Sequence, residues 1–209
     1  VAADRRPEVP VSVHLAESPA ESRFLAHGDG PWRQFLDEVG AWDPAWTAPG
    51  GSPVEYLDQL GFLGPQTLAV HGVQMSEADL GVLAARGATL VTCPRSNVHT
   101  GAGVPPIAAF YRSGVRVAVG TDSLASTPDL SIFQELAAMR AMAPEVPASA
   151  LLESATRHGA AALGFGREFG TIEPGKRARL LAVRLPPATA DVEQYLVGGV
   201  RPDALTWID

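Results

Sequence analysis

Short apolar segments alternate along the chain with longer segments of helical spacing. Four short segments are rich in β-branched residues and are interpreted as strands: residues 11–15, 67–72, 88–93 and 115–122. The last three are almost continuously apolar, which is typical of parallel strands covered on both faces. The longer segments are predicted helices at residues 76–87, 105–114, 128–143 and 147–166, the last as one or two helices. This alternation predicts βαβ units and therefore an α/β fold with a parallel sheet.

Two regions depart from that alternation. Residues 28–66 are rich in Gly and Pro and hold three of the four tryptophans, so we interpret them as a long connection with short helices that could serve as a lid. Residues 170–185 are expected to form two short strands around a Pro-Gly turn, with more strand-like sequence at 195–209. The predicted division is thus a main domain over 1–168 and part of a small β domain over 169–209.

The composition limits the partners and the cellular location that we expect for the protein. Hydrophobic residues make up 46% of the 209 positions, enough for a large core, and the net charge of −7 argues against a nucleic-acid partner. The single cysteine, Cys93, excludes an internal disulfide and a Cys-rich metal site, and it favours a reducing, cytoplasmic location. The sequence has no apolar run of about 18 residues, so we expect no membrane span.

Four reactive side chains fall at or just after the ends of predicted strands. His14 ends the first strand, with Glu17 three residues later, His71 ends the second, and Asp122 ends the fourth. Each has an ordinary explanation: a hydrogen-bonded core histidine, a glutamate in a first helical turn, a turn residue and an N-cap. If all four ordinary explanations held, four unrelated roles would have put reactive side chains at the same edge of the sheet by chance. We therefore predict an active site there, where α/β enzymes have theirs.

The side-chain types at this edge indicate metal chemistry. Imidazole and carboxylate groups without thiolate form a ligand set for a hard or borderline divalent ion. Such an ion lowers the pKa of a bound water, and a nearby carboxylate can then carry protons. His14 and Asp122 alone are too few for a tight site, so further ligands are expected from elsewhere.

Several motifs, taken in order, resemble those of a known family. "VHLAES", "AVHG", "CPRSN" and "VGTDSLAS" resemble successive signatures of the amidohydrolase superfamily. The similar branch contains cyclic-amidine deaminases and chlorohydrolase-like enzymes, including cytosine, guanine, S-adenosylhomocysteine and aminodeoxyfutalosine deaminases. "GTIEPGKRARLLAV" resembles the family's entry into a small β-sandwich, although Arg179 replaces the usual Asp. The resemblance implies a (β/α)₈ TIM-type barrel of which only strands 5–8 are present, plus part of the C-terminal β-sandwich.

The resemblance also implies roles for the four residues. His14 and Asp122 would be metal ligands, and Asp122 would also take a proton from the attacking water. Glu17 would pass a proton to a ring nitrogen of the substrate. His71 would orient the water, although in binuclear branches the equivalent histidine is itself a ligand. The implied cofactor is one divalent ion, zinc before iron. The implied reaction is hydrolytic deamination of an amino-substituted N-heterocycle, such as a nucleobase or the adenine nucleosides aminodeoxyfutalosine and S-adenosylhomocysteine.

Further residues near these motifs are candidate substrate contacts. Arg95, Ser96 and Asn97 follow the third strand and are expected at the mouth of the site, and Ser123 follows Asp122. Arg95 could pair with a substrate carboxylate or phosphate, or equally form a salt bridge within the protein. Ser123 could serve only to stabilise its loop. Cys93 is expected to be a buried, inert thiol.

One signature of the family is missing. The H-x-H motif, which would supply two more ligands, does not occur, and the chain has no initiator methionine. Since a complete barrel needs roughly 250 residues, we interpret the chain as the C-terminal half of a larger enzyme. The missing half would be its partner, the fragment alone would be inactive, and its open sheet edges predict a homo-oligomer. The alternatives are a chlorohydrolase or amide hydrolase of the same superfamily, or a non-catalytic half-barrel.

Overall fold

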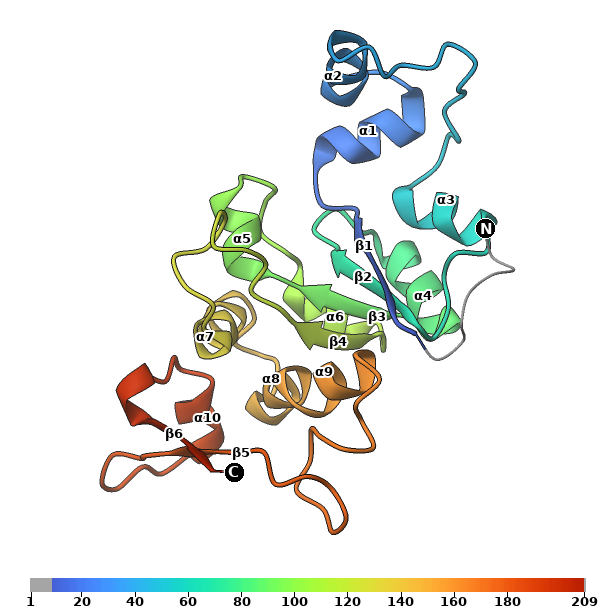
Figure 1. Cartoon of the computed structure of the whole chain (residues 1–209). Helices are drawn as coiled ribbons and strands as arrows, with labels where there is room; N and C mark the ends of the chain where they lie inside the picture. The colour runs from blue at the N-terminus through green and yellow to red at the C-terminus, as the bar shows by residue number, and fades with distance from the viewer. Residues whose placement is uncertain (1–8, 209) are drawn as a thin grey trace.

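The centre of the molecule is a four-stranded parallel sheet. The computed structural model describes residues 9–208, and the strand order within the sheet is β1-β2-β3-β4 (Figure 1). The strands are β1 (Val11–Leu15), β2 (Thr67–His71), β3 (Thr89–Thr92) and β4 (Arg116–Val119). All neighbouring pairs are parallel, so the four predicted strands and the α/β class are confirmed.

Helices fill the connections between these strands and follow the last one. They are α1 (Pro19–His27), α2 (Pro31–Glu38), α3 (Pro53–Gln59), α4 (Glu77–Arg86), α5 (Pro94–His99), α6 (Ile107–Arg112), α7 (Ile132–Met142), α8 (Ala148–Ala155), α9 (Arg157–Ala162) and α10 (Val192–Leu196). Helix α4 shows how the sequence sets its bounds: Ser76 and Asp79 form a capping box, and Gly87 ends the helix in the left-handed conformation.

Most helix predictions hold, and one boundary was wrong. The segment 147–166 forms two helices, α8 and α9, that meet at Thr156. The helix predicted from residue 128 begins only at Ile132, because Ser131 caps it and accepts a hydrogen bond from the backbone of Gln134. Leu130 therefore precedes the helix and is 56% exposed.

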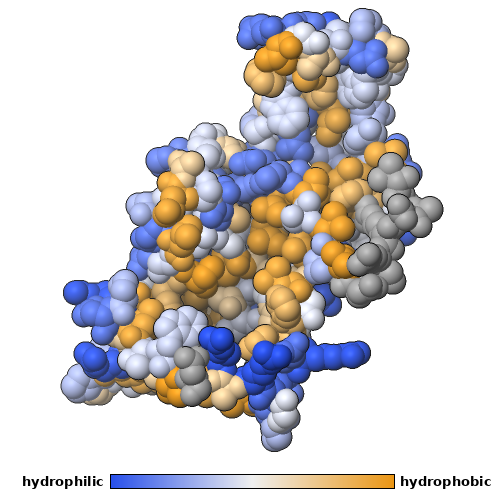
Figure 2. All heavy atoms as spheres, in the orientation of Figure 1, coloured by the Kyte–Doolittle hydropathy of each residue, from blue (hydrophilic) through white to orange (hydrophobic). Residues whose placement is uncertain are grey.

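The two faces of the sheet are covered differently. In register across the sheet lie Val13, Ala69, Leu90 and Val117; the last three belong to the buried core, and Val13 packs against it. The adjacent row, which includes His14, points to the opposite face, because side chains alternate along a strand. None of that row joins the core cluster, and Figure 2 shows hydrophobic side chains gathered over the sheet on the side facing the viewer.

The connection between β1 and β2 extends away from the sheet at one end of the molecule (Figure 1). As predicted, it contains short helices, α2 and α3. Its own small cluster is aromatic: the rings of Phe24 and Trp46 stack at 4.6 Å, and Trp42 meets Trp46 edge-on at 5.7 Å. That this connection acts as a lid stays a prediction.

The C-terminal segment lies at the opposite end (Figure 1) and corrects one prediction. Only one strand forms in 170–185, β5 (Leu180–Val183), and it pairs antiparallel with β6 (Leu205–Ile208), which follows a short 3₁₀ turn at Pro202–Ala204. The segment before the Pro-Gly turn is not a strand, because β5, which follows the turn, pairs with β6 instead. The backbone N–H of Arg177, just after the turn, donates to the carbonyl of Glu168. Val197, just after α10, belongs to the main core, so this segment packs against the rest of the chain.

Across residues 9–208, no helix combines the length and the apolar character that crossing a bilayer requires.

Candidate active site

The carboxyl ends of β1, β2 and β4 bring the predicted residues to one edge of the sheet. Leu15 lies beside His71 in the register of β1 and β2, so His14 and Glu17 flank the end of β2. The rings of His14 and His71 stack with centroids 5.2 Å apart, and Glu17 Oε2 lies 3.7 Å from His71 Nε2. His14, Glu17 and His71 therefore form one group across two adjacent strand ends.

Backbone strain marks the same edge. Four described non-glycine residues have positive φ, and three of them are Ala16 (51°), His71 (82°) and Asp122 (62°), at or just after the ends of β1, β2 and β4. L-residues rarely adopt this region because Cβ crowds the backbone, and such residues concentrate at functional sites. No motif in the sequence predicts this strain.

His71 is held as a neutral hydrogen-bonding ring. It is 1% exposed, and its Nδ1 lies 2.9 Å from the side-chain nitrogen of Asn97. An amide nitrogen can only donate, so Nδ1 is the acceptor and the ring proton lies on Nε2, toward Glu17. Burial keeps the pKa of His71 below its ordinary value, and nearby His14 acts in the same direction against the opposing charges of Glu17 and Asp122.

Asp122 is held as an ionised carboxylate. Ser96 donates to its Oδ2 at 2.6 Å, and Ser126 donates to the same oxygen at 3.1 Å. Burial acts to raise the pKa of Asp122, but these two hydrogen bonds, together with His71 and His14, outweigh it, so the pKa lies below the ordinary value. Both bonds reach Oδ2, and within the described part of the chain Oδ1 accepts none.

The turn that carries Glu17 is fastened by a second glutamate. Glu21, on α1 and 7% exposed, accepts the backbone N–H of Ala16 at 2.9 Å and that of Glu17 at 2.8 Å. Ser18 caps the helix from its N-terminus. The carboxylate of Glu21 thus holds the strained turn after β1, although the sequence alone did not single it out.

The residues after β3 lie deeper than expected. Ser96 and Asn97 are fully buried on α5 and contact Asp122 and His71, whereas the sequence placed them at the mouth. Arg95 forms salt bridges with Asp129 at 2.8 Å and Glu135 at 3.6 Å, one of the two arrangements left open for it. Direct substrate contacts by these three residues stay predictions.

The remaining two predicted residues have structural contacts. The carbonyl of Ser123 accepts bonds from the backbone of Ser126 and Thr127, and its hydroxyl accepts one from the backbone of Ala125, so Ser123 stabilises its loop. Burial raises the pKa of Cys93 to about 12, aided by the charges of Asp122 and Glu135. That thiol stays protonated at neutral pH, as expected of an inert cysteine.

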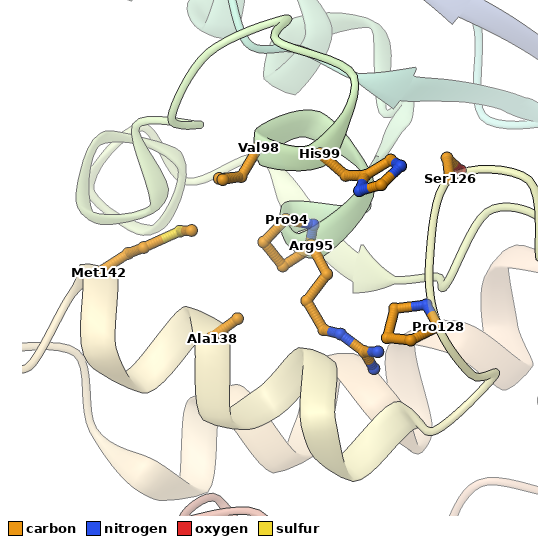
Figure 3. Close-up of a pocket in the computed structure, with 8 residues that line it drawn as sticks. All are labelled: Pro94, Arg95, Val98, His99, Ser126, Pro128, Ala138 and Met142. Atoms are coloured by element: carbon orange, nitrogen blue, oxygen red, sulfur yellow. The ribbon is translucent and has the colours of Figure 1, made fainter.

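A cavity of 360 Å³ lies beside this site, between α5 and α7 (Figure 3). Its wall is mainly apolar, with a few polar groups, and consists of Pro94, Arg95, Val98, His99, Ser126, Pro128, Ala138 and Met142. Ser96 and Asn97 are not among its lining, so the cavity borders the site through Ser126 and does not contain it.

The donor set suits a divalent metal ion in kind but not in number. A neutral imidazole and an ionised carboxylate are suitable ligands, and a catalytic zinc takes three protein ligands. Yet within residues 9–208 no three His, Cys, Asp or Glu side chains gather closely enough to hold an ion. The proton on Nε2 of His71 further favours that ring as a hydrogen-bond donor over a ligand through Nε2. That His14 and Asp122 supply part of a ligand set stays a prediction.

A family model decides the relationship: the amidohydrolase family matches residues 2–201. The chain belongs to the amidohydrolase family. Among its relatives, the 5-methylthioadenosine/S-adenosylhomocysteine deaminase of Halobacterium salinarum is 38% identical over 190 residues, which cover 88% of this chain and 39% of that protein. The aminodeoxyfutalosine deaminase of Deinococcus radiodurans is 34% identical over 165 residues, covering 75% of this chain and 39% of that one.

Solved amidohydrolase structures agree with the fold. An adenosine deaminase from Xanthomonas campestris with bound zinc superposes with a TM-score of 0.76 at 32% identity, over 94% of this chain and 43% of that one. A mutant of the atrazine chlorohydrolase of Arthrobacter aurescens, with zinc and atraton, has a TM-score of 0.71 at 19% identity. The match covers 96% of this chain and 42% of that one, and it shows the fold alone. This chain spans about two fifths of these proteins.

Proposed function

We propose that the protein containing this chain is a metal-dependent deaminase of an adenine nucleoside. The observation that carries the proposal is the convergence of His14, Glu17, His71 and Asp122 at one strained edge of the sheet. Relatives named as 5-methylthioadenosine/S-adenosylhomocysteine and aminodeoxyfutalosine deaminases support the substrate class.

The proposed cofactor is one divalent ion, with zinc preferred because two solved relatives contain it. His14 and Asp122 would hold it together with ligands outside this chain. When bound, such an ion lowers the pKa of a water molecule and so makes a nucleophile available at neutral pH.

The side chains of this chain would then move protons around the reacting carbon. Asp122, ionised by its serine partners, accepts a proton from the attacking water and passes it to the leaving amine. Glu17 in its acid form protonates the ring nitrogen, so charge on the heterocycle is neutralised as the carbon becomes tetrahedral, and it recovers a proton from the new hydroxyl as the carbonyl forms and ammonia leaves. His71 donates from Nε2 and orients the attacking oxygen.

The rest of the barrel belongs to the proposal as well. The open face of the sheet, the two sheet edges at β1 and β4, and the short ligand set all favour a partner half-barrel. We propose that strands 1–4 supply it, that residues 169–209 contribute to a β-sandwich, and that the complete protein is a homo-oligomer.

Ammonia release tests the proposed reaction. The complete natural protein that contains these 209 residues is loaded with zinc and assayed on adenosine, 5-methylthioadenosine, S-adenosylhomocysteine and a chlorotriazine. We expect ammonia from at least one adenine nucleoside and no chloride from the triazine. Chloride release without ammonia would instead favour the chlorohydrolase alternative.

A further inference from the structure

A buried carboxylate outside the proposed catalytic group has an unusual environment. Glu135, on α7, is fully buried. Its Oε2 accepts the backbone N–H of Arg95 at 3.1 Å, while its Oε1 has no hydrogen-bond partner among the described residues and lies 3.6 Å from the Arg95 guanidinium. An incompletely paired buried carboxylate is costly, and well-packed apolar residues are often at least as stable in such a place. Packing alone therefore does not account for Glu135.

The hydrogen bond from Arg95 lies at the start of α5. This helix has six residues, its N-cap position is Cys93, and no side chain of its own caps it. Pro94 has no N–H, so the N–H of Arg95 is the first donor of the helix that needs a partner. Glu135, 40 residues further along the chain, supplies that partner.

The two residues after Arg95 order the candidate active site. Ser96 donates to Asp122 Oδ2 at 2.6 Å, and Asn97 lies 2.9 Å from His71 Nδ1. Both are fully buried on the same short helix. A shift at the start of α5 would therefore move both hydrogen bonds together.

We infer that Glu135 is a positioning residue: by capping α5 through the N–H of Arg95, it fixes the two side chains that orient Asp122 and His71. It touches neither of those residues through a hydrogen bond and is therefore not a catalytic residue. The effect on turnover rests on the proposed function, but the ordering of His71 does not.

Two substitutions separate the cap from the packing of Glu135. Glu135→Gln keeps an oxygen that can accept the N–H of Arg95, whereas Glu135→Met keeps the length of the side chain and removes the acceptor. Asp129→Asn is the matched control, because it weakens the exposed salt bridge to Arg95 and leaves the cap intact.

The first measurement is the ¹⁵N signal of His71 Nδ1, in the complete natural protein labelled on histidine. We expect Glu135→Met to shift it away from the value of a hydrogen-bonded acceptor, and Glu135→Gln and Asp129→Asn to leave it in place. A folded Glu135→Met protein with an unchanged signal would overturn the inference, and so would a Glu135→Gln protein that shifts as far as Glu135→Met. This readout requires no turnover, so it stands or falls separately from the deaminase proposal.

The second measurement is steady-state deamination. Loss of a residue that orients catalytic groups commonly costs about tenfold or more in activity, so we expect Glu135→Met to lower kcat about tenfold with little change in KM. Glu135→Gln should restore kcat. Equal loss in both variants would contradict a role through the hydrogen bond.

Amide exchange of Arg95 in the unsubstituted protein covers the case in which Glu135→Met does not fold. The bond to Glu135 predicts slow exchange of that single amide. Exchange as fast as that of an exposed amide would show that the cap does not exist and would overturn the inference.

Discussion

The two sides of the candidate site differ in how far their side chains are buried and hydrogen-bonded. Around Asp122 and His71, every orienting side chain is buried and hydrogen-bonded, and Ser96 and Asn97 are fully enclosed. On the other side, His14 is exposed on an edge strand, and its ring stacks on that of His71. The chain thus has a buried, hydrogen-bonded side of the candidate site, around Asp122 and His71, and an exposed side at His14, and substitutions can test the two sides separately.

The largest effect is expected at Asp122. Asp122→Asn keeps an oxygen for Ser96 and Ser126 but cannot accept a proton, so the turnover number should fall by about 10²–10⁴-fold. Ammonia release measures the loss, and thermal unfolding checks that the fold is kept. Activity within tenfold of the parent would show that the ordered side does not handle the proton.

A pair of truncations compares the two sides directly. Asn97→Ala leaves the buried Nδ1 of His71 without a donor and should cost about 1–3 kcal/mol of unfolding free energy. His14→Ala on the exposed side should stay within about 0.5 kcal/mol. Urea unfolding measures both values. Similar losses of unfolding free energy in the two variants would show that the two sides do not differ in how tightly they are held.

The pH dependence of stability provides a finer test of the ordered side. Burial raises the pKa of Glu135 to about 7, above its ordinary value, despite the opposing bond and charge of Arg95. A carboxyl group with a raised folded-state pKa contributes stability that is fully present below its unfolded pKa and is lost as the pH rises through about 7.

Glu135→Gln does not titrate at this position. Its stability relative to the parent should therefore increase by about 3 kcal/mol between pH 4.5 and pH 8, in proportion to the raised pKa. Urea unfolding across that range measures the difference. If the difference in unfolding free energy between the two proteins does not change with pH, burial does not raise the pKa of Glu135.

The smallest effect is expected from the weaker serine bond to Asp122. Ser126→Ala removes the 3.1 Å hydrogen bond and keeps the 2.6 Å bond from Ser96, so the pKa of Asp122 should rise slightly, and less than in Ser96→Ala. Carboxyl ¹³C titration measures both changes. A larger rise in the pKa of Asp122 in Ser126→Ala than in Ser96→Ala would show that Ser126 makes the stronger hydrogen bond.

Much of the sheet could be predicted because its signals are local. Apolar runs, Gly at helix ends and the Ser76–Asp79 capping box give the strands and α4 directly. The strand before the Pro-Gly turn was predicted wrongly because β5 pairs with β6, which begins more than twenty residues later, and a local pattern carries no information about such a partner.

The site divides in the same way. His14, Glu17, His71 and Asp122 could be named because each stands at or near the end of a recognisable strand. Glu21 and Glu135 could not, since they occupy ordinary helical positions and act on the backbone of other segments. Ser96 and Asn97 were predicted at the mouth of the site because the six residues of α5 are too few to show a helical pattern of apolar positions.

Zinc-dependent deamination in two variants of β1 tests the central claim most directly. His14 and Ser12 are exposed and lie on the same face of the strand, two residues apart, so Ser12→Ala is the matched control for His14→Ala. In the zinc-loaded complete natural protein, ammonia release from an adenine nucleoside should be lost in His14→Ala and kept in Ser12→Ala. Full activity in His14→Ala would contradict a metal-dependent site at these strand ends.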